Sequence, residues 1–172
     1  GFTLQLLPTI NCRELPSNPR ISSSSIRQAL VDGRLDDANV MLGRPYFVAG
    51  VVSGGDQRGR TIGFPTANIE QIPHLLPQEA VYAAVAQLED KSLHLAAVNV
   101  GRQPTFDGHR SRVEAHVLDF SGDLMGQRMG LHFLERLRSQ TRFGGIDALI
   151  AQIRADVVAV RRHAGTLARV VT

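Results

Sequence analysis

Short apolar segments between residues 46 and 138 constrain the fold of this chain more than any other feature of its sequence. The segments, rich in Val, Phe and Ala, span residues 46–53, 80–88, 93–100, 112–120 and 129–137. Glycine, proline and aspartate separate them at short intervals, which is typical of strands joined by turns. The pattern predicts an all-β sandwich or barrel. Closure into a barrel would leave no exposed strand edges.

Helical patterns flank this β region. Residues 21–25, Ile-Ser-Ser-Ser-Ser, predict the start of a short helix, because a serine can cap the first turn, and Gly33 can end it in a left-handed conformation. A second short helix is predicted over residues 35–42. The Gly-Arg-Pro that follows it predicts a domain boundary, with residues 1–43 on one side and residues 44–172 on the other.

The C-terminal part returns to a helical period. Six apolar residues follow the i, i+3, i+4, i+7, i+11, i+14 spacing of one helical face: Ile146, Leu149, Ile150, Ile153, Val157 and Val160. Asp147 lies near the start of this helix and Arg161 near its end, as the helix dipole favours. We expect the helix to pack on the β region.

The composition excludes several classes of protein. With 43% hydrophobic and 20% charged residues in 172, wholesale disorder is excluded. No apolar run approaches the roughly 20 residues of a membrane span, so no membrane partner is expected. The single cysteine, Cys12, allows no intrachain disulfide, which suits a cytoplasmic location. Because the chain begins with Gly1 and a strand-like stretch, residues 2–8, we expect it to be a piece of a longer protein.

The net charge of +3 suits an anionic partner without selecting one. The arginines are scattered, aromatic residues make up 5% of the chain, and Trp is absent, so nucleic-acid binding lacks stacking side chains. We therefore expect no nucleic-acid partner. A basic nucleic-acid-binding barrel is kept as an alternative, which steeply salt-dependent RNA binding would support.

A glycine-rich loop follows the first predicted strand. Residues 54–63 are Gly-Gly-Asp-Gln-Arg-Gly-Arg-Thr-Ile-Gly, with four glycines in ten positions. Glycine lets backbone amides approach a ligand closely, and amides beside arginines suit phosphate oxygens. The loop is not a P-loop, because the Gly-Lys-Ser/Thr ending is missing. A polar hairpin loop with solvated arginines is the alternative.

Two oxygen-bearing side chains come next. Pro65 restricts the backbone, and Thr66 and Asn68 lie two positions apart, so in an extended chain they project to the same side. A hydroxyl and an amide carbonyl are hard, neutral donors that suit Mg²⁺ when phosphates supply the negative charge. The pattern indicates a magnesium–phosphate site. An Asx-turn or ST-turn without metal is the alternative.

Residues 55–68, with the pattern Gly-x-x-x-Gly-Arg-Thr-x-Gly-x-Pro-Thr-Ala-Asn, resemble the signature of the riboflavin kinase family. The resemblance covers about residues 42–161 and includes further family segments at 42–46, 97–106, 113–120, 123–126 and 137–143. Residues 42–46 are similar to the junction into the kinase domain of bifunctional bacterial FAD synthetases. Residues 1–41 resemble the end of the adenylyltransferase domain that precedes it, with residues 21–27 similar to a late Ser-Ser-x-x-Ile-Arg motif.

This resemblance implies a mainly β fold: a closed six-stranded Greek-key barrel with a C-terminal amphipathic helix and a small N-terminal helical segment. It also implies ATP- and Mg²⁺-dependent phosphorylation of the riboflavin 5′-hydroxyl to FMN, with an adenylyltransferase domain normally preceding on the same chain. Nothing like that domain's phosphate-binding histidine motif precedes Ile21, so we expect this chain to make FMN but not FAD. A non-catalytic barrel that binds flavin or nucleotide is the alternative.

The resemblance assigns roles to individual residues. Thr66 and Asn68 would hold Mg²⁺ and the ATP phosphates, and Glu114 would be the general base. Arg138 and Phe143 match positions that contact the flavin, although Phe143 could instead anchor the last helix to the barrel. The remaining ligand-binding positions are Gly54, Arg58, Gly59, Arg60, Gly63 and Asn99.

Glu114 lies in mid-strand between apolar neighbours, where a carboxylate is costly unless it has a partner. By alternation, Glu114 and His116 share one face of the strand. Glu114 could instead face solvent or pair with Arg110 or Arg112. We expect His116 to be structural, as a hydrogen-bonding partner.

The chain departs from the family pattern at three places. Met125 replaces a usual tyrosine, Gln140 lies near a usual acidic residue, and Gly144-Gly145 replaces a usual Asp-Ser that would cap the last helix. These departures concern flavin binding more than ATP chemistry. Residues 101–112 and 139–145 are expected to be loops that close over the substrate.

Overall fold

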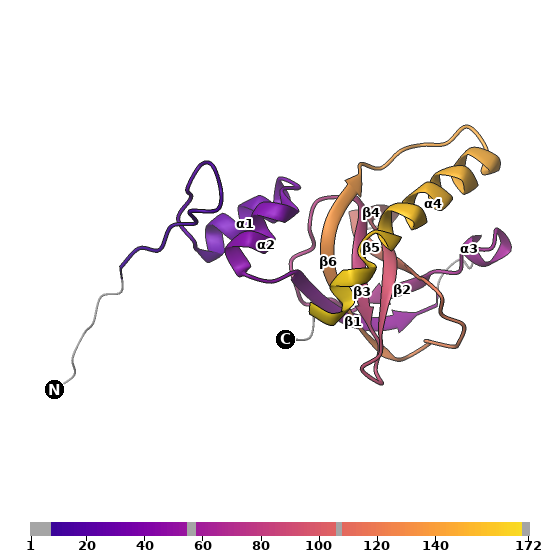
Figure 1. Cartoon of the computed structure of the whole chain (residues 1–172). Helices are drawn as coiled ribbons and strands as arrows, with labels where there is room; N and C mark the ends of the chain where they lie inside the picture. The colour runs from indigo at the N-terminus through magenta and orange to yellow at the C-terminus, as the bar shows by residue number, and fades with distance from the viewer. Residues whose placement is uncertain (1–7, 55–57, 106–107, 170–172) are drawn as a thin grey trace.

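Six strands close into an antiparallel barrel in the part of the chain that the computed structural model describes, residues 8–54, 58–105 and 108–169 (Figure 1). The strands are β1 (Tyr46–Ser53), β2 (Ala67–Glu70), β3 (Ala80–Gln87), β4 (Leu93–Thr105), β5 (Gly108–Val117) and β6 (Arg128–Arg138). Around the barrel their order is β1-β2-β5-β4-β3-β6, and β6 pairs with β1 to close it. The predicted mainly β fold with a closed six-stranded barrel is confirmed.

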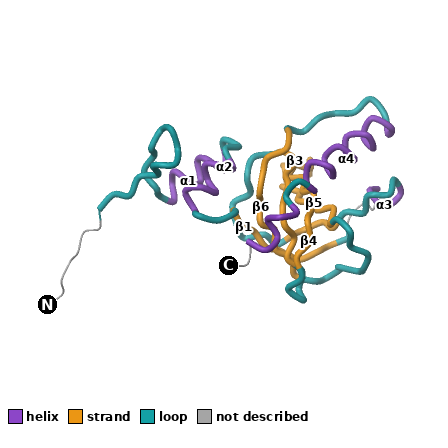
Figure 2. The backbone as a smooth tube through the Cα atoms, viewed as in Figure 1, coloured by secondary structure: helices purple, strands orange, loops and turns teal. Residues whose placement is uncertain are grey.

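The strands differ from the predicted segments at two places. β2 has only four residues, too few for a period-two pattern to be recognised, and the segment analysis missed it. β4 extends to Thr105, β5 begins at Gly108, and these two residues pair with each other. Figure 2 draws the strands of the barrel in orange. The expectation that residues 101–112 form a loop is therefore wrong, because the two strands continue as a long hairpin.

Alternating side chains divide the barrel into an apolar interior and a more polar outer face. In β5, Val113 and Ala115 are buried in the interior cluster, while Glu114 and His116 are partly exposed on the outer face. The rings of Tyr82 and Phe133, both fully buried, meet edge to face with centroids 5.2 Å apart. The outer face of β5 is therefore free to carry polar side chains toward a ligand.

Helix α4 (Ile146–Arg161) packs on the outside of the barrel over β3 and β4 (Figure 1). Its N-cap is Gly145, which offers no side-chain cap, as expected from the glycine pair. Val157 and Val160 of the predicted apolar stripe pack against the barrel, whereas Ile146 at the other end is 59% exposed. The first half of the helix thus leaves apolar side chains uncovered.

Two short helices precede the barrel: α1 (Ser23–Val31) and α2 (Leu35–Leu42). The Ser22 hydroxyl accepts a hydrogen bond from the Ser25 amide and so caps α1, as predicted. Gly33 follows α1 with a φ angle of +76°, the left-handed conformation expected of it, and Gly43 follows α2 with a φ angle of +66°. Throughout the described residues, neither these helices nor any other combine the length and apolar character needed to cross a bilayer.

Helix α2 is joined to the barrel by a polar side chain and by apolar packing. The Asn39 side chain accepts a hydrogen bond from the Tyr46 amide at 2.7 Å and donates one to the Phe133 carbonyl at 3.0 Å. Leu30 and Leu35 belong to the same buried cluster as the barrel interior. The division at residues 43 and 44 remains a prediction, and all but the last residue of the strand-like stretch 2–8 lies outside the described residues.

Candidate active site

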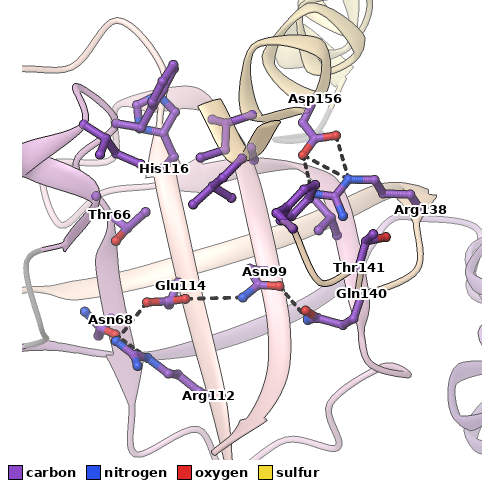
Figure 3. A pocket seen from close by; sticks show the side chains of 18 residues that line it. Thr66, Asn68, Asn99, Arg112, Glu114, His116, Arg138, Gln140, Thr141 and Asp156 are labelled. Atoms are coloured by element: carbon purple, nitrogen blue, oxygen red, sulfur yellow. Dashed lines mark hydrogen bonds and ion pairs between the residues drawn. The ribbon is translucent and has the colours of Figure 1, made fainter. Parts of the chain in front are cut away.

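A cavity of about 420 Å³ lies on the outer face of the barrel, bounded by strands β2, β5 and β4, by the segment after β6 and by α4 (Figure 3). Its polar lining residues are Thr66, Asn68, Asn99, Arg112, Glu114, His116, Arg138, Gln140, Thr141 and Asp156. Its apolar and glycine lining residues are Gly59, Ile62, Phe64, Val81, Ala97, Phe143, Leu149 and Ile153. The cavity therefore combines hydrogen-bonding groups with an apolar wall beneath the uncovered half of α4.

Strand register brings three of the predicted site residues into one row. Asn68 of β2 lies directly opposite Glu114 of β5, and Glu114 lies directly opposite Asn99 of β4. Residues opposite each other on neighbouring strands share a face and lie within side-chain reach. The Asn99 amide accordingly donates a hydrogen bond to Glu114 Oε2 at 3.3 Å. This row forms the floor of the cavity.

The Arg112 side chain contacts two members of this row, Asn68 and Glu114. Its Nε donates to Asn68 Oδ1 at 3.0 Å, and its Nη2 lies 2.9 Å from Glu114 Oε1. The side chains of Arg112 and Glu114 are 26% and 24% exposed, so the ion pair is only partly covered. Pairing with Arg112, which the sequence offered as an alternative for Glu114, thus occurs together with a position in the cavity.

The glycine-rich loop reaches the cavity through Gly59. Helix α3 (Arg58–Thr61) is a single turn, and the Phe64 amide donates back to the Gly59 carbonyl at 2.8 Å. A Cβ at Gly59 would lie 2.3 Å from the Phe64 carbonyl oxygen and 3.4 Å from Thr66 Oγ1. Only glycine allows this approach, which places the turn beside Thr66 in the cavity wall.

Other predicted loop residues are placed elsewhere. Gly54 and Gly63 do not line the cavity. Gly63 has a φ angle of +84°, so it serves the turn between the loop and β2. The side chains of Arg58 and Arg60 lie outside the described residues, so their phosphate-binding role remains a prediction.

His116 ties β5 to the turn that carries Thr66. Its Nδ1 lies 2.8 Å from the Pro65 carbonyl oxygen, and its ring meets Phe64 edge to face at 5.5 Å. Both contacts hold the Pro-Thr-Ala-Asn segment against the strand that carries Glu114. This is the structural role expected of the histidine.

Gln140 holds the far end of the row. Its side-chain amide donates to Asn99 Oδ1 at 2.6 Å and to the Val100 carbonyl at 2.9 Å. Because Asn99 accepts from Gln140 through its oxygen, its amino group is left to face Glu114 (Figure 3). Sequence reasoning noted Gln140 only as a departure from the family pattern, and nothing local in the sequence indicates this contact.

On the opposite side of the cavity, Arg138 forms a two-pronged ion pair with Asp156 of α4, with its Nε and Nη2 2.7 to 3.1 Å from the carboxylate. Gln152 donates to the same carboxylate at 2.9 Å. The Arg138 guanidinium also lies 5.7 Å from the centroid of the Phe143 ring. Asp156 was not predicted as a site residue. It lies four positions before Val160, on the apolar face of the predicted helix, and a charged residue on such a face is the signal that could have indicated it.

The donor groups of the cavity suit a cation that enters together with an anionic ligand. In the described part of the chain, no group of three or more His, Cys, Asp or Glu residues is arranged to hold a metal ion. Thr66 and Asn68 offer neutral oxygens, and the Asn68 oxygen already accepts from a positively charged guanidinium. These residues fit Mg²⁺ that arrives with phosphate oxygens, since hard cations prefer such ligands.

Known proteins resemble the chain over nearly its whole length. The family model described as Flavokinase, riboflavin kinase, matches residues 42–164. The bifunctional riboflavin kinase/FMN adenylyltransferase of Escherichia coli K12 is 42% identical over 147 residues, covering 85% of this chain and 47% of the relative. The protein of the same description from Listeria monocytogenes is 37% identical over 150 residues, covering 86% and 48%. The chain thus spans about half the length of these curated relatives.

A crystal structure described as a macrolide-efflux protein from Streptococcus pneumoniae shares the fold. It superposes with a TM-score of 0.82 at 34% identity, covering 90% of this chain and 50% of that one. The matched family region contains every residue that lines the cavity, from Gly59 to Asp156. On these grounds, the chain belongs to the riboflavin kinase family.

Proposed function

We propose that this chain transfers the γ-phosphoryl group of ATP to the 5′-hydroxyl of riboflavin, giving FMN and ADP. The observation that carries the proposal is the row of Asn68, Glu114 and Asn99, which places one carboxylate between two amides on the cavity floor. Phosphoryl transfer to an alcohol needs a positioned hydroxyl, an acceptor for its proton and neutralised phosphates. Membership of the riboflavin kinase family supports this reaction.

Glu114 is proposed to accept the proton of the riboflavin hydroxyl. The hydroxyl oxygen then bonds to the γ-phosphorus while the bond to the β–γ bridging oxygen breaks, and ADP leaves. Asn99 holds Glu114 Oε2 from one side, which keeps the carboxylate directed into the cavity. A carboxylate offers more lone pairs than these contacts use, so it can still accept the proton.

Thr66 and Asn68 are proposed to hold Mg²⁺ together with the ATP phosphates. When bound, the ion would neutralise phosphate charge. The turn at Gly59 lies next to Thr66, and its backbone amides are proposed to contact the phosphates. Arg58, Arg60, Gly54 and Gly63 of this loop are proposed to contribute to nucleotide binding.

Riboflavin is proposed to bind along the apolar wall. Phe143, Leu149 and Ile153 line this side of the cavity, and the first half of α4 carries partly exposed apolar side chains. A flat, largely apolar ring gains binding energy by covering such surface. Arg138, fixed by Asp156 beneath Phe143, is proposed to contact the ring's polar edge.

The test is Glu114→Gln, which keeps the shape of the side chain and removes its basicity. We expect FMN formation from riboflavin, ATP and Mg²⁺ to fall by about a hundredfold or more, measured by chromatographic separation of flavins. Nucleotide binding, measured by calorimetry with ADP, should change by less than about threefold. Glu70→Gln, an exposed change on β2, is the matched control and should leave FMN formation unchanged.

A second function is a barrel that binds flavin or nucleotide without turnover. The ion pair between Glu114 and Arg112 favours it, since a paired carboxylate can be purely structural. Wild-type activity equal to that of Glu114→Gln would support this second function and contradict the first.

The division of labour with a preceding domain is also a proposal. The curated relatives are described as bifunctional, and this chain spans about half of their length. We propose that residues 1–172 make FMN but no FAD, and that an adenylyltransferase domain on the same cytoplasmic chain carries the second activity. Formation of FAD from FMN and ATP by residues 1–172 alone would contradict this.

A further inference from the structure

The Arg112 guanidinium occupies the place between the proposed base and the proposed metal ligand. It donates to Asn68 Oδ1 at 3.0 Å through Nε and lies 2.9 Å from Glu114 Oε1 through Nη2 (Figure 3). Both oxygens that the reaction needs are therefore in contact with a permanent positive charge. Their strand partners hold them in register, so the guanidinium bridges two fixed points.

A guanidinium and a divalent cation cannot share this position. A metal ion at Asn68 Oδ1 would lie within a few ångströms of the Arg112 charge, and like charges at such separations repel strongly where water is partly excluded. Arginine also pairs well with phosphate oxygens, through two parallel hydrogen bonds. The Arg112 side chain, 26% exposed, borders the cavity in which the nucleotide phosphates are proposed to bind.

We propose that Arg112 is a positioning residue with two places. In the nucleotide-free protein it holds Asn68 and Glu114 and keeps a metal ion from binding alone. When a cation enters together with a nucleotide, the guanidinium leaves Asn68 and pairs with the phosphates. This inference rests on the proposed function, in which the cavity takes a cation–nucleotide complex.

The remaining contacts allow this exchange without losing the base. Glu114 Oε2 is held by Asn99, which is held in turn by Gln140. When Arg112 departs, the carboxylate thus keeps one partner and its direction into the cavity.

The first test measures metal binding without nucleotide. Mn²⁺ serves as the probe, and its free concentration is followed by electron paramagnetic resonance. Arg112→Met removes the charge and the contacts with Asn68 and Glu114 while nearly keeping the length of the side chain. We expect its Mn²⁺ dissociation constant to be about tenfold lower than that of the wild type, because Asn68 and Glu114 become available. Arg128→Met removes the same charge from an exposed position on β6 and should behave as wild type.

The second test measures ADP binding in the presence of Mg²⁺ by calorimetry. Arg112→Met should bind Mg²⁺–ADP about tenfold more weakly, because the guanidinium no longer reaches the phosphates. Arg112→Lys keeps a point charge that cannot bridge two groups in the same way. Its affinities for Mn²⁺ and for Mg²⁺–ADP should lie between those of the wild type and those of Arg112→Met. If Arg112→Met does not fold, as judged by circular dichroism, the comparison of Arg112→Lys with wild type takes its place.

An unchanged Mn²⁺ affinity would overturn the proposal, since Arg112 would then not occupy the metal position. An unchanged or tighter Mg²⁺–ADP affinity would overturn it as well, since the guanidinium would then not move to the phosphates. Neither measurement depends on turnover. A wild-type chain that forms no FMN would contradict the proposed function alone, so the two failures are distinguishable.

Discussion

At the scale of single residues, the two arginines of the cavity differ in how firmly they are held. Arg138 makes a two-pronged pair with Asp156, whose side chain is 7% exposed and has Gln152 as a further partner. Arg112 pairs with Glu114 where both side chains remain about a quarter exposed. A buried pair is costly to break, whereas an exposed one contributes little to stability. Because Asp156 is far more buried than Glu114, breaking the Arg138 pair should cost more stability than breaking the pair of Arg112 with Glu114.

Asp156→Asn tests the fixed pair. The change leaves the Arg138 charge without its carboxylate beneath α4, and we expect the free energy of unfolding to fall by about 2 kcal/mol in urea denaturation. The apparent KM for riboflavin should rise as well, because Arg138 and Phe143 lose their support. Asp147→Asn, at an exposed position in the first turn of the same helix, should cost about 0.5 kcal/mol at most. Equal losses for the two variants would contradict a special role for Asp156.

His132 makes stability depend on pH. Burial, with a smaller effect from Arg44, lowers the pKa of His132 from its usual 6.5, and the ring packs on Phe47 with centroids 4.6 Å apart. The unfolded chain then takes up the proton more readily than the folded one. This stabilisation is fully present above about pH 6.5 and is lost as the pH falls through the lowered pKa. Between about pH 7.5 and pH 5.5 the wild-type Tm should therefore fall more than that of His132→Gln; parallel Tm curves would contradict this.

At the scale of strands and helices, the register of strand pairing determines which side chains meet in the cavity. Local alternation in the sequence was enough to place Glu114 and His116 on one face of a strand, and their placement agrees with it. The meeting of Asn68, Glu114 and Asn99 depends on pairing among β2, β5 and β4, which lie far apart in the sequence. Such pairing leaves no local period. The sequence pattern singled out Asn68 and Glu114 separately, and only the family resemblance added Asn99.

Other elements escaped prediction for related reasons. The four residues of β2 are too few to show alternation, and the hairpin of β4 and β5 runs through a segment rich in turn-forming residues. The contact of Gln140 with Asn99 joins positions in different elements and has no sequence signal. By contrast, both ends of α1 were predicted well, because a serine cap and a left-handed Gly33 act locally.

Gly59→Ala tests the turn of α3. A Cβ there would lie 2.3 Å from the Phe64 carbonyl oxygen, a backbone atom, so the turn has to move away from Thr66. We expect the apparent KM for ATP to rise about tenfold in steady-state kinetics, with the Tm changing by only a few degrees because the turn lies outside the core. Gly144→Ala, where nothing lies within 4 Å of the added Cβ, should keep the wild-type KM. An unchanged KM for Gly59→Ala would show that the turn takes no part in nucleotide binding.

At the scale of the whole molecule, helices α1 and α2 share one apolar core with the interior of the barrel. Leu30 and Leu35 of the helical segment are at most 2% exposed, and they belong to the same buried cluster as Phe133 of the barrel. Asn39 satisfies backbone groups of both β1 and β6, and the Gln78 amide donates to the Leu30 carbonyl. The helices thus cover a patch of the barrel that would otherwise be apolar and open.

This packing makes the predicted boundary at residues 43 and 44 testable. We expect residues 44–172 alone to be less stable than residues 1–172 by about 3 kcal/mol or more, or to fail to fold, because several buried apolar side chains are lost together. Asn39→Ala should reproduce part of this loss, about 1 to 2 kcal/mol in urea denaturation, since it leaves the Tyr46 amide and the Phe133 carbonyl without their partner. Asp36→Ala, an exposed change on the same helix, should cost about 0.5 kcal/mol or less. If residues 44–172 unfold at the same urea concentration as the longer chain, the barrel is an independent domain and the helices are only attached to it.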